Sequence, residues 1–297
     1  MKPDLTIGRL AELACSMEVL APKPGNVYPG AEWNFTNTTV ADFLKSAKAI
    51  SFVFDRAKGL TVGELVLNSV RATQLQVTTN TNLGQVLLLA PLAVALSEWG
   101  KLSEENVRET LDRLTIDDSE KVYEAIRTAS PGGMGQKADQ DIREKPTQPL
   151  LQIMQMVQSE DGIAEAYATG FWKIFHTGRS AIYQSIYAGK PWRDVIVDCH
   201  IELLGMGDTL IRRKAGADAE RIVQQRARGV LNLKSNPNQY AAALRELDRD
   251  LRVGGNRLNP GTTADLVTAS LFLALSEGVL QIPLEMDQLC DKYNPRP

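Results

Sequence analysis

Four short polar segments contain the residue types that bind phosphate groups and metal ions. Each has a glycine and lies beside an apolar stretch, and together they supply cations, carboxylates, hydroxyls and amides: PKPGNV at 22–27, TTNTNLG at 78–84, GDTLIRRKAG at 207–216 and NPGTTADL at 259–266. Lysine and arginine bind phosphates, and Mg²⁺ is commonly held by one or two carboxylates together with phosphate oxygens. The combination suits a metal-bound polyphosphate.

The first and third segments carry the charged candidates. Two prolines stiffen the chain around Lys23, so this lysine is expected to project from a rigid loop, and Gly25 would allow the backbone to approach a ligand closely. In the third segment the carboxylate of Asp208 is followed by the cations Arg213 and Lys214. We expect the cations to contact phosphates and Asp208 to bind a metal ion.

The second and fourth segments each open a strongly apolar stretch. Free backbone N–H groups and the helix dipole favour an anion at such a position. The candidate phosphate-binding residues there are small or polar: Asn80, Thr81, Asn82, Gly84, Gly261, Thr262 and Thr263, with Asp265 as a further carboxylate. Taken singly, each segment is also typical of a helix cap or a surface loop. Their joint occurrence favours a binding site.

One more acidic stretch follows the Pro131 turn. Residues 139–144 contain three acids, of which Asp139 and Asp141 are further candidate metal ligands. The stretch is equally typical of an exposed acidic loop.

The hydrophobic periodicity that must position these segments is helical. Apolar residues recur at the i, i+3, i+4, i+7 spacing from Leu10 to Met17, with Asp4 as a candidate cap, and alternating patterns are scarce. Further helices are expected to begin near residues 39, 61, 103, 117, 146, 162, 177, 192, 217 and 236. The connections are short, which predicts a single all-α domain over residues 1–297.

Two segments, Leu83–Leu96 and Ala264–Leu275, are apolar on nearly every side. Such helices are buried at the centre of a bundle, surrounded by amphipathic ones. The polar segments that precede them should therefore lie deep in the fold.

Composition excludes several functional classes. The 33 Lys and Arg residues are balanced by 36 Asp and Glu residues, so there is no net basic field to bind nucleic acid. The longest apolar run, Val86–Leu96, is about half of the roughly 20 residues that a membrane span needs. Three cysteines without CxxC spacing, and no secretory pattern at the start, predict a cytoplasmic protein with reduced thiols. Assembly of the chain into a homo-oligomer stays an open alternative.

The histidines do not suggest a metal or catalytic centre. His176 and His200 are the only two, and neither has metal-ligand spacing to other His or Cys residues. We interpret both as core or surface residues.

Together the four segments resemble the signature blocks of the triphosphoribosyl-dephospho-CoA synthase family, in the same order. Glu18 precedes PKPGNV, NTN.G occupies 80–84, Asp-Thr begins at Asp208, and PGTTADL spans 260–266. The resemblance implies an all-helical transferase that uses ATP and 3′-dephospho-CoA, displaces adenine and attaches the triphosphoribosyl group to the acceptor.

Three histidines of the family pattern are replaced in this chain. The corresponding positions read Asn82, Glu32 and Arg213, within the stretches 80–84, 30–35 and 213–216. The scaffold and nucleotide pocket resemble the family, while the acceptor or the reaction is expected to differ. A divergent branch that resembles this family is linked to tetrahydromethanopterin-type one-carbon metabolism.

For the reaction implied by the resemblance, displacement of adenine passes through an oxocarbenium-like state. The candidate catalytic residues are Glu18, Lys23 and Asp208, with Glu18 placed to orient Lys23 or to steady the ribosyl cation. Mg²⁺ with ATP is the expected cofactor, held by Asp208 and Asp265 and, as further candidates, Asp139 and Asp141. Partners are a nucleotide and an unidentified small acceptor.

Two alternatives stay open: a diverged nucleotide-dependent enzyme of pterin-carrier biosynthesis, and a helical nucleotide-binding protein without turnover. In every case we expect one deep polar cavity, lined by Lys23, Asn80, Asn82, Asp208, Arg213, Thr262 and Asp265. We also expect Lys23 and Asp208 to lie outside the apolar core.

Overall fold

The computed structural model describes residues 5–31, 38–129 and 142–293. Within these ranges the chain forms fifteen α-helices, one π-helix, one 3₁₀-helix and no strand, which confirms the predicted all-α class. The elements are α1 (Ile7–Leu20), α2 (Val40–Phe54), α3 (Val62–Gln74), α4 (Leu83–Trp99), α5 (Glu104–Asp112), α6 (Ile116–Ala129), α7 (Leu150–Val157), α8 (Gly162–Ala168), η2 (Lys173–Gly178), α9 (Arg179–Tyr187), α10 (Trp192–Leu204), α11 (Thr209–Ala215), α12 (Ala217–Leu231), α13 (Pro237–Leu251), η3 (Gly255–Leu258), α14 (Gly261–Ser276) and α15 (Met286–Tyr293).

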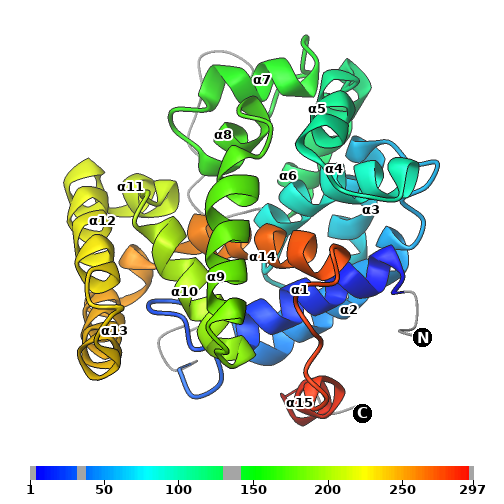
Figure 1. The fold of residues 1–297 in the computed structure, drawn as a ribbon. Coiled ribbons are helices and arrows are strands. Elements are labelled where there is room, and N and C mark those ends of the chain that lie inside the picture. The colour runs from blue at the N-terminus through cyan, green and yellow to red at the C-terminus, as the bar shows by residue number, and fades with distance from the viewer. Residues whose placement is uncertain (1–4, 32–37, 130–141, 294–297) are drawn as a thin grey trace.

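The two helices predicted to be central are α4 and α14. α14 runs through the middle of the molecule and packs against α1, α4, α10 and η2 (Figure 1). Both are apolar around most of their circumference, and their buried polar contact is a hydrogen bond from Gln85 Nε2 to Thr268 Oγ1 at 3.0 Å. Among the described residues no single helix has the length and apolar character to cross a membrane; α4 and α5 meet that test only as a pair bent by 108°.

The buried apolar residues form two clusters. The larger one contains the inner faces of α1 to α4 and of α14. The smaller one joins α10 to α11, α12 and α13, and α12 and α13 lie at one side of the molecule (Figure 1). α10 contributes to both clusters, so it connects the two parts of the fold. The single-domain interpretation stays a prediction.

Several predicted helix starts coincide with the observed caps. Thr39, Thr61, Ser103 and Asn236 each accept a backbone hydrogen bond at the first turn of α2, α3, α5 and α13. Such a side chain satisfies one of the N–H groups that a helix start leaves free. These boundaries follow from local sequence.

Other boundaries differ from the expectation. Thr6, not Asp4, caps α1, and Asp4 lies outside the described residues. The helix expected near residue 146 begins at Leu150, and the one expected near 177 is preceded by the π-helix η2. α15 was not expected, because its apolar face is short.

Candidate functional site: the first turn of α14

The first and third segments both contact the start of α14. The Asp208 carboxylate accepts hydrogen bonds on Oδ2 from Thr263, at 2.7 Å from the backbone N–H and 2.8 Å from the hydroxyl. From the other side, the Asn26 amide donates to Asn259 Oδ1 at 2.8 Å and to the Pro260 carbonyl at 3.4 Å. The third and first segments, about 55 and 230 residues away along the chain, therefore meet the fourth segment directly.

The second segment reaches the same turn through Gly84. A Cβ atom at this position would overlap the Asp265 carboxylate, so only glycine allows α4 and α14 to approach this closely. All four segments thus converge on the first turn of α14, over residues 259–265.

Asp208 is a buried connector. It is 1% exposed, and it also caps α11 by accepting from Ile211 N–H at 3.0 Å on Oδ1. Burial raises the pKa of this carboxyl group, and the hydrogen bonds from Thr263 and from α11 oppose that shift. A carboxylate has about four acceptor positions, and three are occupied here. Asp208 therefore holds α11 on α14 and keeps little capacity to bind a metal ion.

Asp265 is the opposite case. Its partly buried carboxylate has no hydrogen-bond or ion-pair partner within the described ranges. Burial raises its pKa well above the ordinary value, and the negative charges of Glu18, Asp208 and Asp161 raise it further. An unpartnered acid in a negative environment has the electrostatics of a cation site.

Lys23 does not project from its loop as expected. It is 0% exposed, forms an ion pair with Glu18 Oε1 at 3.0 Å, and donates to the carbonyls of Glu18 and of Ala21, the latter at 3.1 Å. These three acceptors match the three N–H donors of an ammonium group. Lys23 therefore folds back to cap the C-terminus of α1, and the expectations that it projects from the loop and lies outside the core are wrong.

Glu18 is buried together with Lys23. Burial raises the pKa of Glu18 and lowers the pKa of Lys23, and in each case the charge of the partner opposes the shift. The predicted role of Glu18 in orienting Lys23 fits this geometry. Replacement of either residue would leave an unpaired buried charge, which is costly.

Glycine is required at position 25 for a reason other than the expected approach of the backbone to a ligand. Its φ of +79° favours glycine, and a Cβ atom would lie 2.8 Å from Pro260 Cδ and 2.9 Å from Leu251 Cδ1. The close approach is thus to the protein itself, and it fits the loop at 22–28, here called the Lys23 loop, against α13 and α14.

Sequence reasoning missed two residues that hold the Lys23 loop, Asp248 on α13 and Arg252 at its C-cap. Asp248 accepts hydrogen bonds from Gly25 N–H at 2.8 Å and from the Tyr28 hydroxyl at 3.0 Å. Arg252 donates to the Asn26 carbonyl at 2.9 Å and lies over the Tyr28 ring. Their i, i+4 spacing on a helix was the available signal.

The contact of His200 with the Lys23 loop was not predicted. Its ring is fully buried against the Lys23 loop, with Nε2 3.2 Å from the Pro24 carbonyl, so Nε2 carries the proton. Burial, helped by the charge of Lys23, lowers its pKa to about 3. His200 is a neutral core residue, as interpreted from the sequence, and it supports the Lys23 loop.

The polar residues of the second segment turn in different directions. Thr81 hydrogen-bonds to Ser46 at 2.5 Å, and Asn82 donates to Thr73 at 3.1 Å, while the exposed Asn80 accepts from Leu83 N–H at 3.1 Å. Thr81 and Asn82 are therefore buried against α2 and α3.

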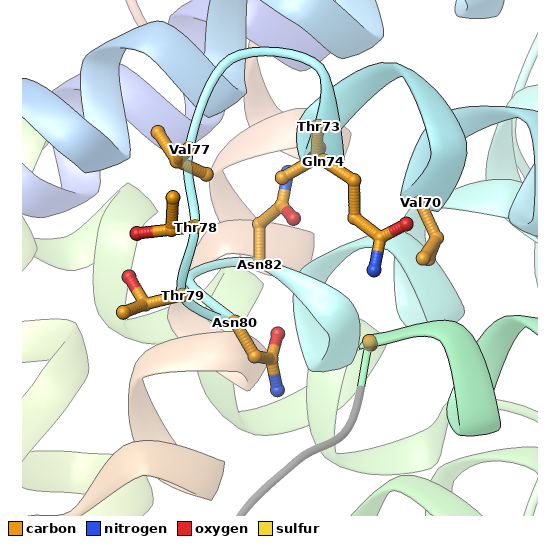
Figure 2. A pocket seen from close by; sticks show the side chains of 9 residues that line it. Val70, Thr73, Gln74, Val77, Thr78, Thr79, Asn80 and Asn82 are labelled. Atoms are coloured by element: carbon orange, nitrogen blue, oxygen red, sulfur yellow. Dashed lines mark hydrogen bonds between the residues drawn. The ribbon is translucent and has the colours of Figure 1, made fainter.

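A small pocket lies between α3, the loop that follows it and the end of α6. Figure 2 shows the Asn82 amide directed toward Thr73 at this pocket. Its volume is about 30 Å³, which is room for about two water molecules. Of the seven residues expected to line one deep cavity, only Asn80 and Asn82 line this pocket. It is too small for a nucleotide.

The remaining candidates lie at the outer side of the α14 turn. Arg213 is half-exposed and 3.6 Å from Asp161, and Lys214 donates to the Asn256 carbonyl at 3.4 Å. The hydroxyl of Thr262 lies 3.3 Å from that of Thr209. Gly261 packs against the end of the Leu210 side chain, which a Cβ atom at this position would displace.

Within the described residues, no three His, Cys, Asp or Glu side chains lie close enough together to hold a metal ion. Asp139 and Asp141 lie outside the described residues.

Comparison with known proteins supports the resemblance found in the sequence. The family model for ATP:dephospho-CoA triphosphoribosyl transferase (CitG) matches residues 4–282, a range that includes all four segments. A crystal structure from Archaeoglobus fulgidus, provisionally named a triphosphoribosyl-dephospho-CoA synthase, is 28% identical, with a TM-score of 0.61; the match covers 80% of this chain and 100% of that chain. No curated protein matches this chain. The convergent segments thus lie in an ATP-dependent transferase, and the chain belongs to the ATP:dephospho-CoA triphosphoribosyl transferase family.

Proposed function

We propose that this chain transfers the triphosphoribosyl group of ATP to 3′-dephospho-CoA, with release of adenine, at the first turn of α14. In this reaction the bond between the ribose C1′ and adenine breaks, C1′ bonds to an acceptor hydroxyl, and the hydroxyl proton leaves with the base. The convergence of four segments, distant in sequence, on one helix turn in a chain of this family supports the proposal.

The residues of the turn have properties that such a reaction requires. Positive charge develops on the ribose as adenine leaves, and the unpartnered carboxylate of Asp265 would stabilise it. In the described ranges the backbone N–H groups of Thr262 and Gly84 have no acceptor, and they would donate to phosphate oxygens. Asp208 and Thr263 would keep α11 and α14 in register around the substrate.

We propose Mg²⁺ as the ion that accompanies ATP. Asp265 fits a hard cation, because it is an oxygen ligand with no partner and its neighbours Glu18, Asp208 and Asp161 are negative. When bound, Mg²⁺ would neutralise the triphosphate charge. Asp208 contributes mainly through the field of its charge, since most of its acceptor positions are occupied.

The decisive experiment incubates the purified chain with ATP, Mg²⁺ and 3′-dephospho-CoA, and measures free adenine by chromatography and the product by mass spectrometry. The expected result is adenine and triphosphoribosyl-dephospho-CoA in equal amounts, with loss of both in Asp265→Asn. Asp218→Asn is the matched control, because Asp218 is 92% exposed on α12.

Other outcomes would reject the proposed acceptor. Release of adenine only with a different acceptor, such as a pterin, would keep the transfer and change the substrate. Stabilisation by ATP with no product from any acceptor would show a binding protein without turnover.

A further inference from the structure

The Lys23 loop is surrounded by polar atoms whose hydrogen bonds are incomplete. Three buried side-chain atoms at or beside this loop have no partner: Asn26 Oδ1, His200 Nδ1 and Arg252 Nη1. Buried polar groups are nearly always paired, so a group of unpaired ones at one loop calls for an explanation. Asn26 Oδ1 and His200 Nδ1 are acceptors, whereas Arg252 Nη1 is a donor, and an anionic ligand would supply the acceptor that Nη1 lacks.

Arg252 has the chemistry of an anion ligand. Its side chain is 7% exposed, and Nε and Nη2 are already engaged with Asp248 at 2.9 and 2.8 Å. Nη2 also donates to the Asn26 carbonyl at 2.9 Å, and the guanidinium plane lies 5.2 Å from the centre of the Tyr28 ring. The Nε and Nη2 edge of the guanidinium is therefore fixed by these contacts, and Nη1 has no hydrogen-bond partner.

The other cations of the site are committed elsewhere. All three donors of Lys23 are used at the C-terminus of α1. Arg213 pairs with Asp161, and Lys214 donates to a carbonyl of η3. Among the described residues, Arg252 Nη1 is the one cationic nitrogen that is both buried and unpartnered.

We propose that Arg252 binds a phosphate group of the nucleotide substrate through Nη1, in the place that the sequence assigned to Lys23. Asp248 is its positioning residue, because it holds both the guanidinium and Gly25 of the loop. The identity of the anion as a nucleotide phosphate rests on the proposed function. Because Nη1 is covered by protein, the proposal requires the Lys23 loop to shift when the phosphate binds.

The test measures binding of ATP, and separately of inorganic tripolyphosphate, by calorimetry to the full chain and its variants. We expect Arg252→Gln to weaken both about 10- to 100-fold, as loss of a hydrogen bond to a charged group does. Arg252→Lys keeps the charge and is expected to weaken binding about 10-fold, because one ammonium cannot serve Asp248, Asn26 and a phosphate together. Thermal melts establish that each variant is folded.

Arg226→Gln is the matched control. Arg226 also forms an ion pair with an aspartate of α13, Asp250, but it is 39% exposed, and its ion pairs, with Glu246 and Asp250, do not involve the Lys23 loop. Its replacement should leave both affinities within about twofold of wild type.

The outcomes separate this proposal from the proposed function. Wild-type affinity in Arg252→Lys and in Arg252→Gln would overturn the role of Arg252, even if adenine release is observed; if Arg252→Gln fails to fold, Arg252→Lys decides. Arg252-dependent binding of tripolyphosphate without adenine release would support Arg252 and reject the proposed transfer. Absence of any binding to the wild-type chain would overturn both.

Discussion

Asp198 and Asp265 are both aspartates withdrawn from solvent in the same helical fold, and they differ in every contact. Asp198, on α10, accepts hydrogen bonds from Ser185 at 2.5 Å, Lys190 at 2.6 Å and Tyr240 at 2.7 Å. Burial opposes its ionisation, but these hydrogen bonds outweigh burial and lower its pKa. Asp265, on α14, has no such partner in the described structure, and burial raises its pKa.

The difference separates a carboxylate whose hydrogen bonds are made within the protein from one that has no partner among the described residues. A fully bonded acid joins helices, here α9, α10 and α13, and has no capacity left for a ligand. An acid that burial leaves unpartnered costs stability in the folded chain, and such a cost is typical of sites that bind or catalyse. The following predictions test that distinction, beginning with the largest effect.

Asp198→Ala should reduce the free energy of unfolding by about 3–5 kcal/mol, because it leaves the Lys190 ammonium and the Tyr240 hydroxyl without their shared acceptor. Urea unfolding followed by circular dichroism measures this loss. A loss below 1 kcal/mol would show that the three hydrogen bonds are dispensable and would contradict the structural role assigned to Asp198.

Asp265→Asn should reduce the rate of adenine release by at least about 100-fold, since changes even to outer-shell partners of a metal cost roughly 10- to 100-fold. Its stability should stay equal or rise, because the substitution removes repulsion from Glu18, Asp208 and Asp161. Initial rates and urea unfolding are measured on the same preparation. Full activity in this variant would remove Asp265 from the site.

The two acids should give opposite pH dependences of stability. The raised pKa of Asp265 means that the unfolded chain releases this proton first, so stability declines as the pH rises above about 4 toward the folded pKa. The lowered pKa of Asp198 means that its contribution is present above the unfolded pKa and is lost as the pH falls through the folded pKa, below about 4.

Denaturant unfolding from pH 3 to 8 measures both slopes. Relative to wild type, Asp265→Asn should flatten the decline above pH 4, and Asp198→Asn should flatten the loss on the acid side. Parallel curves for all three proteins would contradict the assigned pKa directions.

Asn80→Ala should have the smallest effect, a loss of about 1 kcal/mol, because the exposed side chain only caps α4 through Leu83 N–H. Affinity for ATP should change less than twofold. A loss of binding larger than the loss of stability would return Asn80 to the nucleotide site, where the sequence placed it.

The helices themselves were predictable from local pattern. The apolar character of Leu83–Leu96 and Ala264–Leu275 identified the two central helices, and polar caps such as Thr39 and Thr61 marked helix starts. These features depend on residues within one or two turns of each other, so no knowledge of the fold is needed to find them.

The roles of the charged residues were less predictable. The sequence predicts a phosphate ligand at Lys23, but this side chain caps the C-terminus of α1. It predicts a metal ligand at Asp208, but this side chain joins α11 to α14. Asp248 and Arg252 read as ordinary charges of an amphipathic helix and hold the Lys23 loop. Each role depends on a partner that the side chain meets only after packing.

The sequence alone therefore determined the all-α class, the two central helices and the choice of the four segments that meet at the first turn of α14, because composition, periodicity and glycine positions are local properties. Tertiary structure decided which charged groups are satisfied and which are free. Asp208 and Asn26 meet the first turn of α14 across about 55 and 230 residues of chain. The free energy of a buried charge depends on such neighbours, and only the packed helices bring them together.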